Sequence, residues 1–191
     1  LTPVLLGFDL AEPDRSTPVR FSTTQPTQAL GTGPVDLQNA ALQFLTSKTL
    51  ANDVATSVGS SFISLASGVT ATLSGTLSGS TSLTVSGGGG TLVLTGTNSP
   101  TRTGPYQLFS GSTLQAAGAT QLGSGSITLS NTSATPNTLK LTSSTSLNNT
   151  IYLYDSNIID IGANNVSLFG LIDDQVFGTP GGFAKEGSGT L

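Results

Sequence analysis

The sequence contains no cysteine, histidine, methionine or tryptophan, and only 8% of its residues are charged. Without histidine or cysteine, the chain cannot form a Ser-His-Asp triad, a thiol nucleophile or most kinds of zinc site. The net charge of −4 disfavours nucleic acid as a partner, because phosphate binding needs a basic surface. No stretch approaches the roughly 18 apolar residues of a membrane helix, so we expect no membrane insertion of this segment.

The chain is rich instead in glycine, small polar residues and aliphatic side chains, and 36% of it is hydrophobic. So much apolar content with so little charge argues against disorder. Threonine, valine, isoleucine and leucine alternate in short runs between glycine, asparagine and serine turns, which predicts many short strands and little helix. We expect strands at 35–37, 42–44, 62–65, 69–73, 83–85, 92–94, 106–109, 127–129, 139–141, 151–154, 159–161 and 166–168.

Residues 1–28 differ from the rest of the chain. Leu1 to Leu10 is apolar and strand-like, and residues 11–18 then bring prolines together with charged side chains. Proline blocks the hydrogen bonding of a sheet, so this piece should leave a sheet or run along its edge. It is either a solvated loop or a contact surface, and its candidates for lateral contact are Asp9, Glu12, Asp14, Arg15 and Arg20.

Two imperfect copies of a unit of roughly 95 residues follow that segment. The run 30–37 corresponds to 122–129, the run 50–54 to 147–151, and the run 73–77 to 168–172. We therefore divide the chain into the non-repeat segment 1–28, a first unit at 29–121 that includes the link to the next unit, and a second unit at 122–191.

A finer rhythm of evenly spaced short strands runs inside each copy. Such strands are typical of a sandwich, a barrel or a β-solenoid, and the internal repeat favours the solenoid. With three strands to a coil, we expect coils of roughly 20–25 residues and about eight coils in all. The side chains expected to point inward are Leu92, Leu94, Ile127, Leu129, Leu139, Leu141, Ile151, Leu153, Ile161 and Leu168.

The glycine-rich phrases resemble a known family. The run GGGTLVLTGTN at 88–98, then GSTLQ at 111–115 and LGSG at 122–125, is similar to the autotransporter-associated β-strand repeat, and 183–191 is similar to the opening of another copy. This resemblance covers about 29–191. It implies a right-handed parallel β-helix in a passenger of a Gram-negative type V secreted surface protein or adhesin, anchored at the outer membrane or released. It implies no catalytic residue, and residues 100–106 depart from the usual Tyr-Thr-Gly element.

Other chemistry remains open at a few positions. Asp155, Asp160, Asp173 and Asp174 form the one acidic cluster, which could serve a polysaccharide-cleaving β-helix, although Asp173-Asp174 is typical of a turn. The glycine runs at 87–90 and 178–182 lack the Lys-Ser/Thr of a phosphate loop and are interpreted as turns. No calcium loop is present in the sequence.

Two further sets of residues suggest a binding function. Threonine-rich stretches such as 69–72 and 80–84 invite an ice-binding interpretation, but Thr-x-Thr does not recur regularly. Outward Tyr152 and Tyr154 could bind carbohydrate, although such a pair is also typical of ordinary packing.

We therefore expect an all-β, right-handed parallel β-helix without enzymatic activity, cofactor or metal. It would serve as a structural or adhesive segment at the bacterial cell surface, with a polysaccharide-binding, polysaccharide-cleaving or ice-binding solenoid as the alternative. Its partners would be a host, glycan or surface receptor and further copies of the unit, joined head to tail. The residues expected to make that head-to-tail contact are Leu1, Val4, Leu6, Gly189, Thr190 and Leu191.

Overall fold

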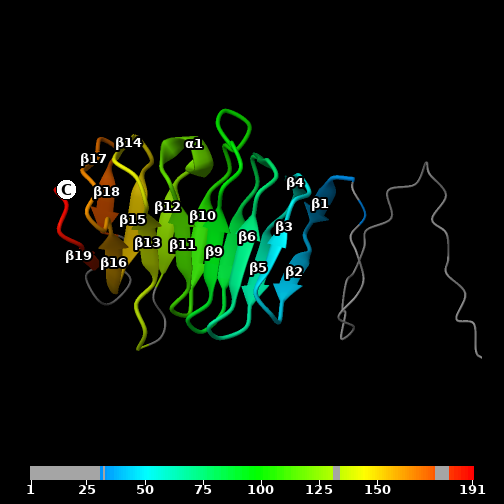
Figure 1. The fold of residues 1–191 in the computed structure, drawn as a ribbon, viewed down its shortest axis with the longest axis horizontal. Helices are drawn as coiled ribbons and strands as arrows, with labels where there is room; N and C mark the ends of the chain where they lie inside the picture. Colours follow the sequence, from blue (N-terminus) through cyan, green and yellow to red (C-terminus); the bar gives the residue numbers. More distant parts are fainter. Residues whose placement is uncertain (1–30, 32, 131–133, 175–180) are drawn as a thin grey trace, which may run out of the picture.

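The computed structural model describes residues 31, 33–130, 134–174 and 181–191. Over these residues the named strands pair in parallel with the strands of the coils before and after them. Figure 1 shows the strands as rows stacked along the long axis of the molecule. The predicted fold class is confirmed, because the chain is an all-β parallel β-helix.

Two seven-stranded parallel sheets form two sides of the helix. Sheet I contains β2 (Ala41–Phe44), β5 (Ser61–Leu65), β8 (Leu83–Ser86), β10 (Tyr106–Phe109), β12 (Ile127–Ser130), β15 (Ile151–Tyr154) and β18 (Ile172–Asp174). Sheet II contains β3 (Lys48–Leu50), β6 (Thr70–Leu73), β9 (Thr91–Leu94), β11 (Thr113–Ala116), β13 (Thr138–Leu141), β16 (Ser156–Asp160) and β19 (Gly182–Glu186).

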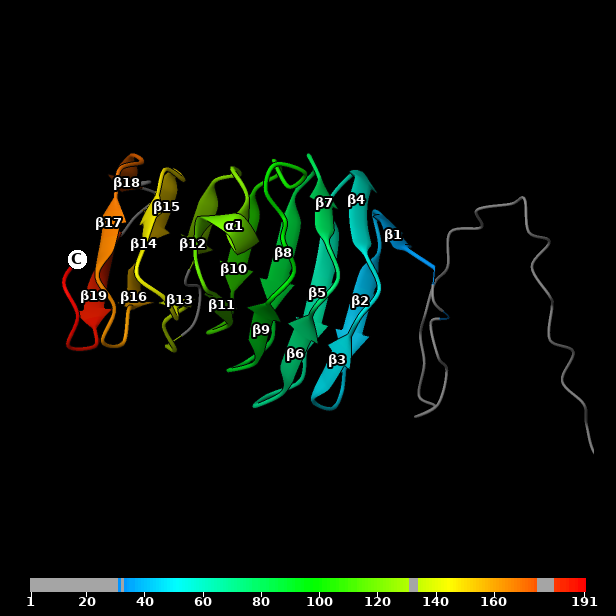
Figure 2. The ribbon, with the colours of Figure 1, turned by 45° about the horizontal axis from the view of Figure 1, so that its top comes forward.

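The third side of the helix is interrupted in the middle. It begins with β1 (Val35–Gln38), β4 (Val54–Val58) and β7 (Leu77–Gly79), and it ends with β14 (Thr145–Leu147) and β17 (Val166–Leu168). Between these two groups lie an isolated bridge from Gly79 to Arg102 and the single-turn helix α1 (Ala119–Leu122). Figure 2 shows α1 in the row of the third side, between β7 and β14. The sheets cross the expected boundary at 121/122 without a break, and α1 spans it.

The register of sheet I defines the coil. Leu42, Ile63, Val85, Leu108, Leu129 and Leu153 face one another in successive coils, so one coil takes between 21 and 24 residues in sheet I, and the register of sheet II gives between 20 and 26. The expected coil length is thus confirmed. Each long sheet has seven strands over the described residues, against the eight coils or so expected for the whole chain.

The inward side chains form one continuous apolar core. Nine of the ten expected core residues are buried, and Leu168 is half-buried against the core. Leu92 of β9 faces Leu114 of β11, which faces Leu139 of β13, so leucines stack on leucines along the axis. Each such side chain removes its apolar surface from water only because the neighbouring coil covers it, at about 1.5–3 kcal/mol per fully buried side chain.

Glycine marks the corners where successive coils approach most closely. A Cβ atom at Gly125 would collide with the carbonyl oxygen of Gly104, and one at Gly96 would collide with that of Gly75. The glycine run 87–90 is a turn, closed by a hydrogen bond from the Gly90 N–H to the Gly87 carbonyl oxygen at 2.6 Å. Its interpretation as a turn is confirmed, whereas part of the run 178–182 lies outside the described residues.

The long sequence repeat is not in phase with the coils. Leu50 lies in β3 of sheet II, but its counterpart Leu147 lies in β14 on the third side. Likewise Val54 lies on the third side in β4, but its counterpart Ile151 lies in β15 of sheet I. The two copies are therefore displaced by one side of the helix, and the structural repeat is the single coil.

Candidate interaction surfaces

The C-terminal end of the described stack exposes several apolar side chains. β18 and β19 are the last strands of their sheets, and no described strand pairs with their outer edges. Phe169 is 72% exposed and Leu171 is 62% exposed in the segment between β17 and β18, and Ile172 of β18 and Leu191 are exposed as well. We call Phe169, Leu171, Ile172 and Leu191 the end face. Unpaired strand edges combined with exposed apolar side chains make a surface that favours pairing with another chain.

The predicted self-association residues divide between this end and a part of the chain that is not described. The Gly189 N–H donates to the Gly162 carbonyl oxygen at 2.9 Å, and the Thr190 carbonyl oxygen accepts from the Val166 N–H at 2.8 Å. The chain thus turns back beside β17 and starts another coil. Leu1, Val4 and Leu6 lie outside the described residues, as do Asp9, Glu12, Asp14, Arg15 and Arg20.

The four acidic residues singled out in the sequence are spread over different parts of the surface. Asp160 lies in β16 of sheet II, whereas Asp173 and Asp174 lie in β18 of sheet I. The turn expected at Asp173-Asp174 is wrong, because Ile172–Asp174 pairs with Ile151–Leu153 of β15. Asp155 follows β15 at a left-handed corner with φ of 60°. In the described residues, no three acidic side chains come close enough to hold a metal ion.

Asp160 is held by two partners. Its Oδ2 atom lies 2.9 Å from the Lys140 Nζ atom, and its Oδ1 atom accepts from the Gly162 N–H at 2.9 Å. The hydrogen bond from Lys140 and that from Gly162 lower the pKa of the Asp160 carboxyl. A carboxylate that is paired in this way stays ionised, which does not suit it as a general acid.

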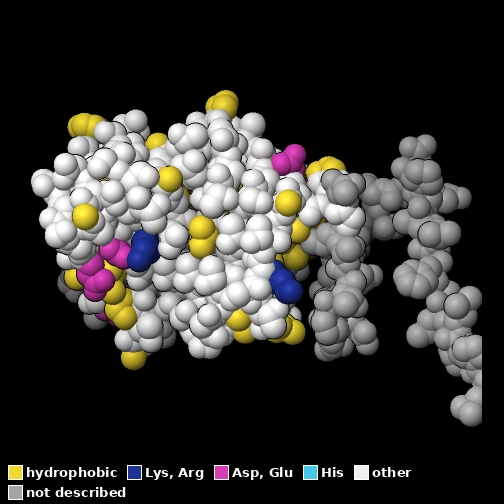
Figure 3. All heavy atoms as spheres, viewed as in Figure 1, with side chains coloured by type: hydrophobic (Ala, Val, Ile, Leu, Met, Phe, Trp, Pro, Cys, Tyr) yellow, Lys and Arg dark blue, Asp and Glu magenta, His cyan; other side chains and the backbone are white. Residues whose placement is uncertain are grey.

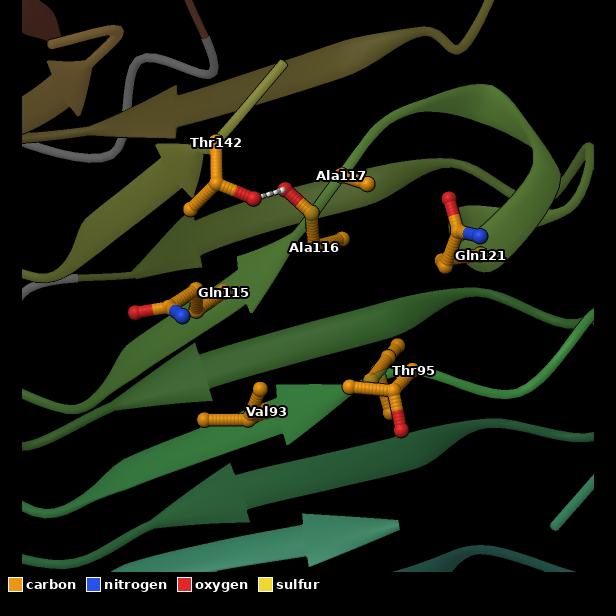
Figure 4. A pocket seen from close by; sticks show the side chains of 8 residues that line it. Val93, Thr95, Gln115, Ala116, Ala117, Gln121 and Thr142 are labelled. Carbon is orange, nitrogen blue, oxygen red and sulfur yellow. Dashed lines mark hydrogen bonds between the residues drawn. The ribbon is translucent and has the colours of Figure 1, made fainter. Parts of the chain in front are cut away.

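One small pocket lies at the corner between sheet II and α1. Its volume is about 150 Å³, and it is lined by Val93, Leu94, Thr95, Gln115, Ala116, Ala117, Gln121 and Thr142. Figure 4 shows the Thr142 hydroxyl pointing at the Ala116 carbonyl oxygen, while the amides of Gln115 and Gln121 point away from each other. This pocket has no charged lining residue and no converging polar groups, so it does not have the features of a catalytic site.

The outer surface has few charges. Figure 3 shows one face of the molecule that is mostly uncharged, with acidic and basic side chains close together near the end formed by β16 and β19. On sheet II, Thr70, Thr91, Thr113 and Thr138 follow one another in four successive coils. We call such a row of paired residues in successive coils a rank. The rank two residues further along the strands runs from Thr72 to Val93, Gln115 and Lys140, so Thr-x-Thr occurs in β6 but not in the next three strands.

A buried cation near the middle of the third side was not predicted from the sequence. Arg102 and Tyr106 are both fully buried, and the Arg102 Cζ atom lies 4.9 Å from the centre of the Tyr106 ring. The Arg102 Nη1 atom donates to the Thr56 hydroxyl at 2.7 Å and to the Thr81 carbonyl oxygen at 3.0 Å, and Nη2 donates to the Pro105 carbonyl oxygen at 2.9 Å. Burial lowers the pKa of Arg102, whose partners among the described residues include no carboxylate.

This arrangement holds the structure together where strands of the third side are missing. The guanidinium occupies the space that follows β7 and binds carbonyl groups of the preceding coil. Arginine suits this place because its planar group carries five donors, and Tyr106 adds a cation–π contact. Because both side chains are enclosed, we assign them a structural role.

Comparison with models of protein families, with curated proteins and with solved structures gives no match for this chain. Among the described residues, no helix has the length and apolar character needed to cross a membrane. Function must therefore be argued from the β-helix and its surfaces.

Proposed function

We propose that this chain is a structural or adhesive segment of an extracellular bacterial surface protein, carried by a type V secretion-like passenger. In this role the segment is a β-helical stalk or a filament-forming unit. The observation that carries the proposal is the uninterrupted stack of parallel coils, with seven strands in each of two sheets around one apolar core. Such a stack is a spacer, since it can grow along one axis without changing its cross-section.

The outer surface supports a location outside the cell. Its polar character comes mainly from serine, threonine and asparagine rather than from charged residues. The resemblance of its glycine-rich phrases to the autotransporter-associated repeat points in the same direction. The glycines of those phrases lie at coil corners, where the fold itself requires a residue without Cβ.

The end face supports continuation from one unit to the next. The outer edges of β18 and β19 offer backbone N–H and C=O groups in the direction of the axis, and the exposed side chains of Phe169 and Leu171 lie in the segment that leads into β18. A further coil that pairs with these edges would cover both the backbone groups and the apolar side chains. Contacts of this head-to-tail kind propagate as an open filament when the rotation between units does not close a ring.

The test compares the self-association of the whole chain with that of variants. We expect sedimentation velocity to show association that increases with concentration, and electron microscopy to show rods longer than one unit. Leu171→Asp should abolish both, because it places a charge in the end face. Val58→Asp is the matched control, since Val58 is 58% exposed at the end of β4, far from the end face.

Hydrogen exchange of the amides of β18 and β19 can contradict this proposal. A monomer in which the outer amides of β18 and β19 are already protected would mean that the chain caps its own end. That result would overturn head-to-tail association of separate copies.

A further inference from the structure

The outer face of sheet I carries a rank of aromatic side chains that the core does not require. Phe109 of β10 and Tyr154 of β15 are both half-buried and alternate with the buried residues of their strands. Ser130 faces Tyr154 from the coil between them, and Ser86 faces Phe109 from the coil before. The register of Leu108 on Leu129 and of Ser130 on Tyr154 places the two rings in the same outward row, two coils apart.

The spacing of this rank follows from the coil. Adjacent parallel strands lie about 4.8 Å apart, so rings two coils apart are separated by about 10 Å along the axis. Tyr152 stands beside Tyr154 on the neighbouring rank, where Gln107 and Thr128 precede it in the two coils before. The face thus combines two aromatic rings two coils apart, and a third beside the second, with amide and hydroxyl groups between them.

Both aromatic residues precede a left-handed corner, as Ser86 of the same row precedes Gly87 and as Gln38 precedes Asn39 elsewhere. Ser110 follows Phe109 with φ of 58°, and Asp155 follows Tyr154 with φ of 60°. Left-handed backbone is unfavourable for residues other than glycine, and such residues cluster at functional sites. Both aromatic residues therefore stand at a sharp corner that costs conformational energy, although glycine would make that turn more easily.

The charges on and around this face indicate which kind of polymer it can bind. From Gln107 and Phe109 to Tyr152 and Tyr154, this face has no charged side chain among its described residues. The nearest charges are Asp155 at the corner and Asp173, which faces Tyr152 from the next coil. Two carboxylates at one end of an otherwise neutral face repel an acidic polymer, whereas a neutral ligand meets no such repulsion.

We infer that Phe109, Tyr154 and Tyr152 form a binding surface for an extended neutral polysaccharide that lies along the axis of the β-helix. The C–H face of a pyranose ring packs on the negatively polarised face of an aromatic ring, and a tyrosine hydroxyl adds a hydrogen bond. Rings at intervals of two coils contact alternate sugars of an extended chain, while Gln107 and Thr128 reach the hydroxyl groups of the sugar between. This activity is separate from the stalk role, because it uses the side of the stack and not its end.

The experiment measures binding of the full chain to microcrystalline β-1,4-glucan, by depletion of protein from solution. Phe109→Ser and Tyr154→Ser are suitable variants, because serine already occupies the same rank at Ser86 and Ser130 and the coil accepts it there. We expect each variant to raise the Kd about tenfold, which is the effect of losing about 1.4 kcal/mol. Tyr154→Phe keeps the ring and should stay within a few-fold of the unmodified chain.

Phe169→Ser is the matched control, since it removes an exposed aromatic ring of the end face and should leave glucan binding unchanged. Circular dichroism of each variant confirms the β-helix. The inference is overturned if the unmodified chain does not bind the glucan, or if a variant that carries both Phe109→Ser and Tyr154→Ser binds it equally well. Binding to polygalacturonate alone would also overturn it, as would dimerisation through this face that Phe109→Ser abolishes.

Discussion

The guanidinium of Arg102 and the ring of Tyr106 stack inside the β-helix, four residues apart in sequence, with no carboxylate among the described partners of the cation. Arg102 begins the coil in which the third side loses its strand, and Tyr106 begins the next strand of sheet I. The hydrogen bonds of Arg102 therefore connect this coil to the preceding ones on the side where the coil has no strand.

Replacing Arg102 should destabilise the fold strongly. Arg102→Met removes the hydrogen bonds of the guanidinium to the Thr56 hydroxyl and to the Thr81 and Pro105 carbonyl oxygens, although Pro105 keeps the Leu83 N–H as a donor. Hydrogen bonds to a charged group contribute about 1.5–3 kcal/mol each. We expect a loss of at least about 2 kcal/mol in the free energy of unfolding, measured by urea denaturation. Lys140→Met, which removes a cation from the surface pair with Asp160, should cost less than about 1 kcal/mol. Equal losses for the two variants would contradict the assigned role of Arg102.

Stability should fall at high pH through Tyr106. Burial raises the pKa of Tyr106 to about 12, against an opposing effect of Arg102, so the folded chain retains a proton that the unfolded chain loses near pH 10. The stabilising contribution is complete below pH 10 and is lost as the pH rises through about 12, with a total of about 3 kcal/mol. Denaturation as a function of pH measures this loss, and Tyr106→Phe should remove it. The same dependence in both proteins would rule out Tyr106 as its source.

Truncating a core leucine should test the stacking of the coils. Leu141 of β13 is buried and faces Ala116 of β11, so Leu141→Ala would leave a cavity that two small side chains cannot fill. The expected cost is about 2–5 kcal/mol by thermal or chemical denaturation. Ser146→Ala, at an exposed position in β14, should change stability by less than about 0.5 kcal/mol.

Two glycines should respond in opposite ways to the same substitution. Gly125→Ala places a methyl group against the backbone of Gly104 in the preceding coil, so the two coils must move apart at a cost of about 1–3 kcal/mol. Gly88→Ala meets open space and should be neutral or stabilise by up to about 1 kcal/mol, because it restricts the unfolded chain. Melting temperatures of the two variants check this difference. A tolerated Gly125→Ala would contradict the close approach of the coils at this corner.

Much of the β-helix could be predicted, because alternating apolar residues identify strands whose inner faces are fully covered. Strands such as β9 and β13 were expected within one residue of their actual bounds. Others were missed, including β4, β7 and β11, which mix threonine, serine, alanine or glycine with only one or two large apolar side chains. Their strand form comes from pairing with the coils on both sides, which a local pattern does not contain.

The long sequence repeat matches residues that form similar corners, although the strands beside those corners belong to different sides of the helix. Asn52 donates to the carbonyl oxygens of Gly31 and Gly33, and Asn149 donates to those of Gly123 and Gly125. The same arrangement, in which one asparagine amide binds two glycine carbonyl oxygens, thus occurs at two different corners of the helix. The matching residues reflect that local solution, and they say nothing about which side of the coil comes next.

The surface residues were harder to predict than the core. Tyr152 and Tyr154 were visible as an outward pair, but Phe109 could not be assigned to the same rank before the register across β10, β12 and β15 was known. Arg102 gave no signal, since a single arginine in a turn is normally solvated. In both instances the missing information was the contact between coils, which lies more than twenty residues away in sequence.

The interrupted third side has a consequence for how the rod responds to tension. Hydrogen bonds between coils run along the axis, so a force that pulls the two ends apart acts on the junctions between coils in series, and the sheets that span one junction share it. Where β10 pairs with β12 and β11 with β13, two sheets hold the coils together, because the strands of the third side stop at β7 and resume at β14. The third side adds single hydrogen bonds there instead of a ladder, from the Ser124 N–H to the Arg102 carbonyl oxygen and from the Asn98 N–H to the Thr120 carbonyl oxygen. A rod stretched by a bound surface should therefore open first at this joint, beside α1, while the three-stranded coils near β1 and β4 stay closed.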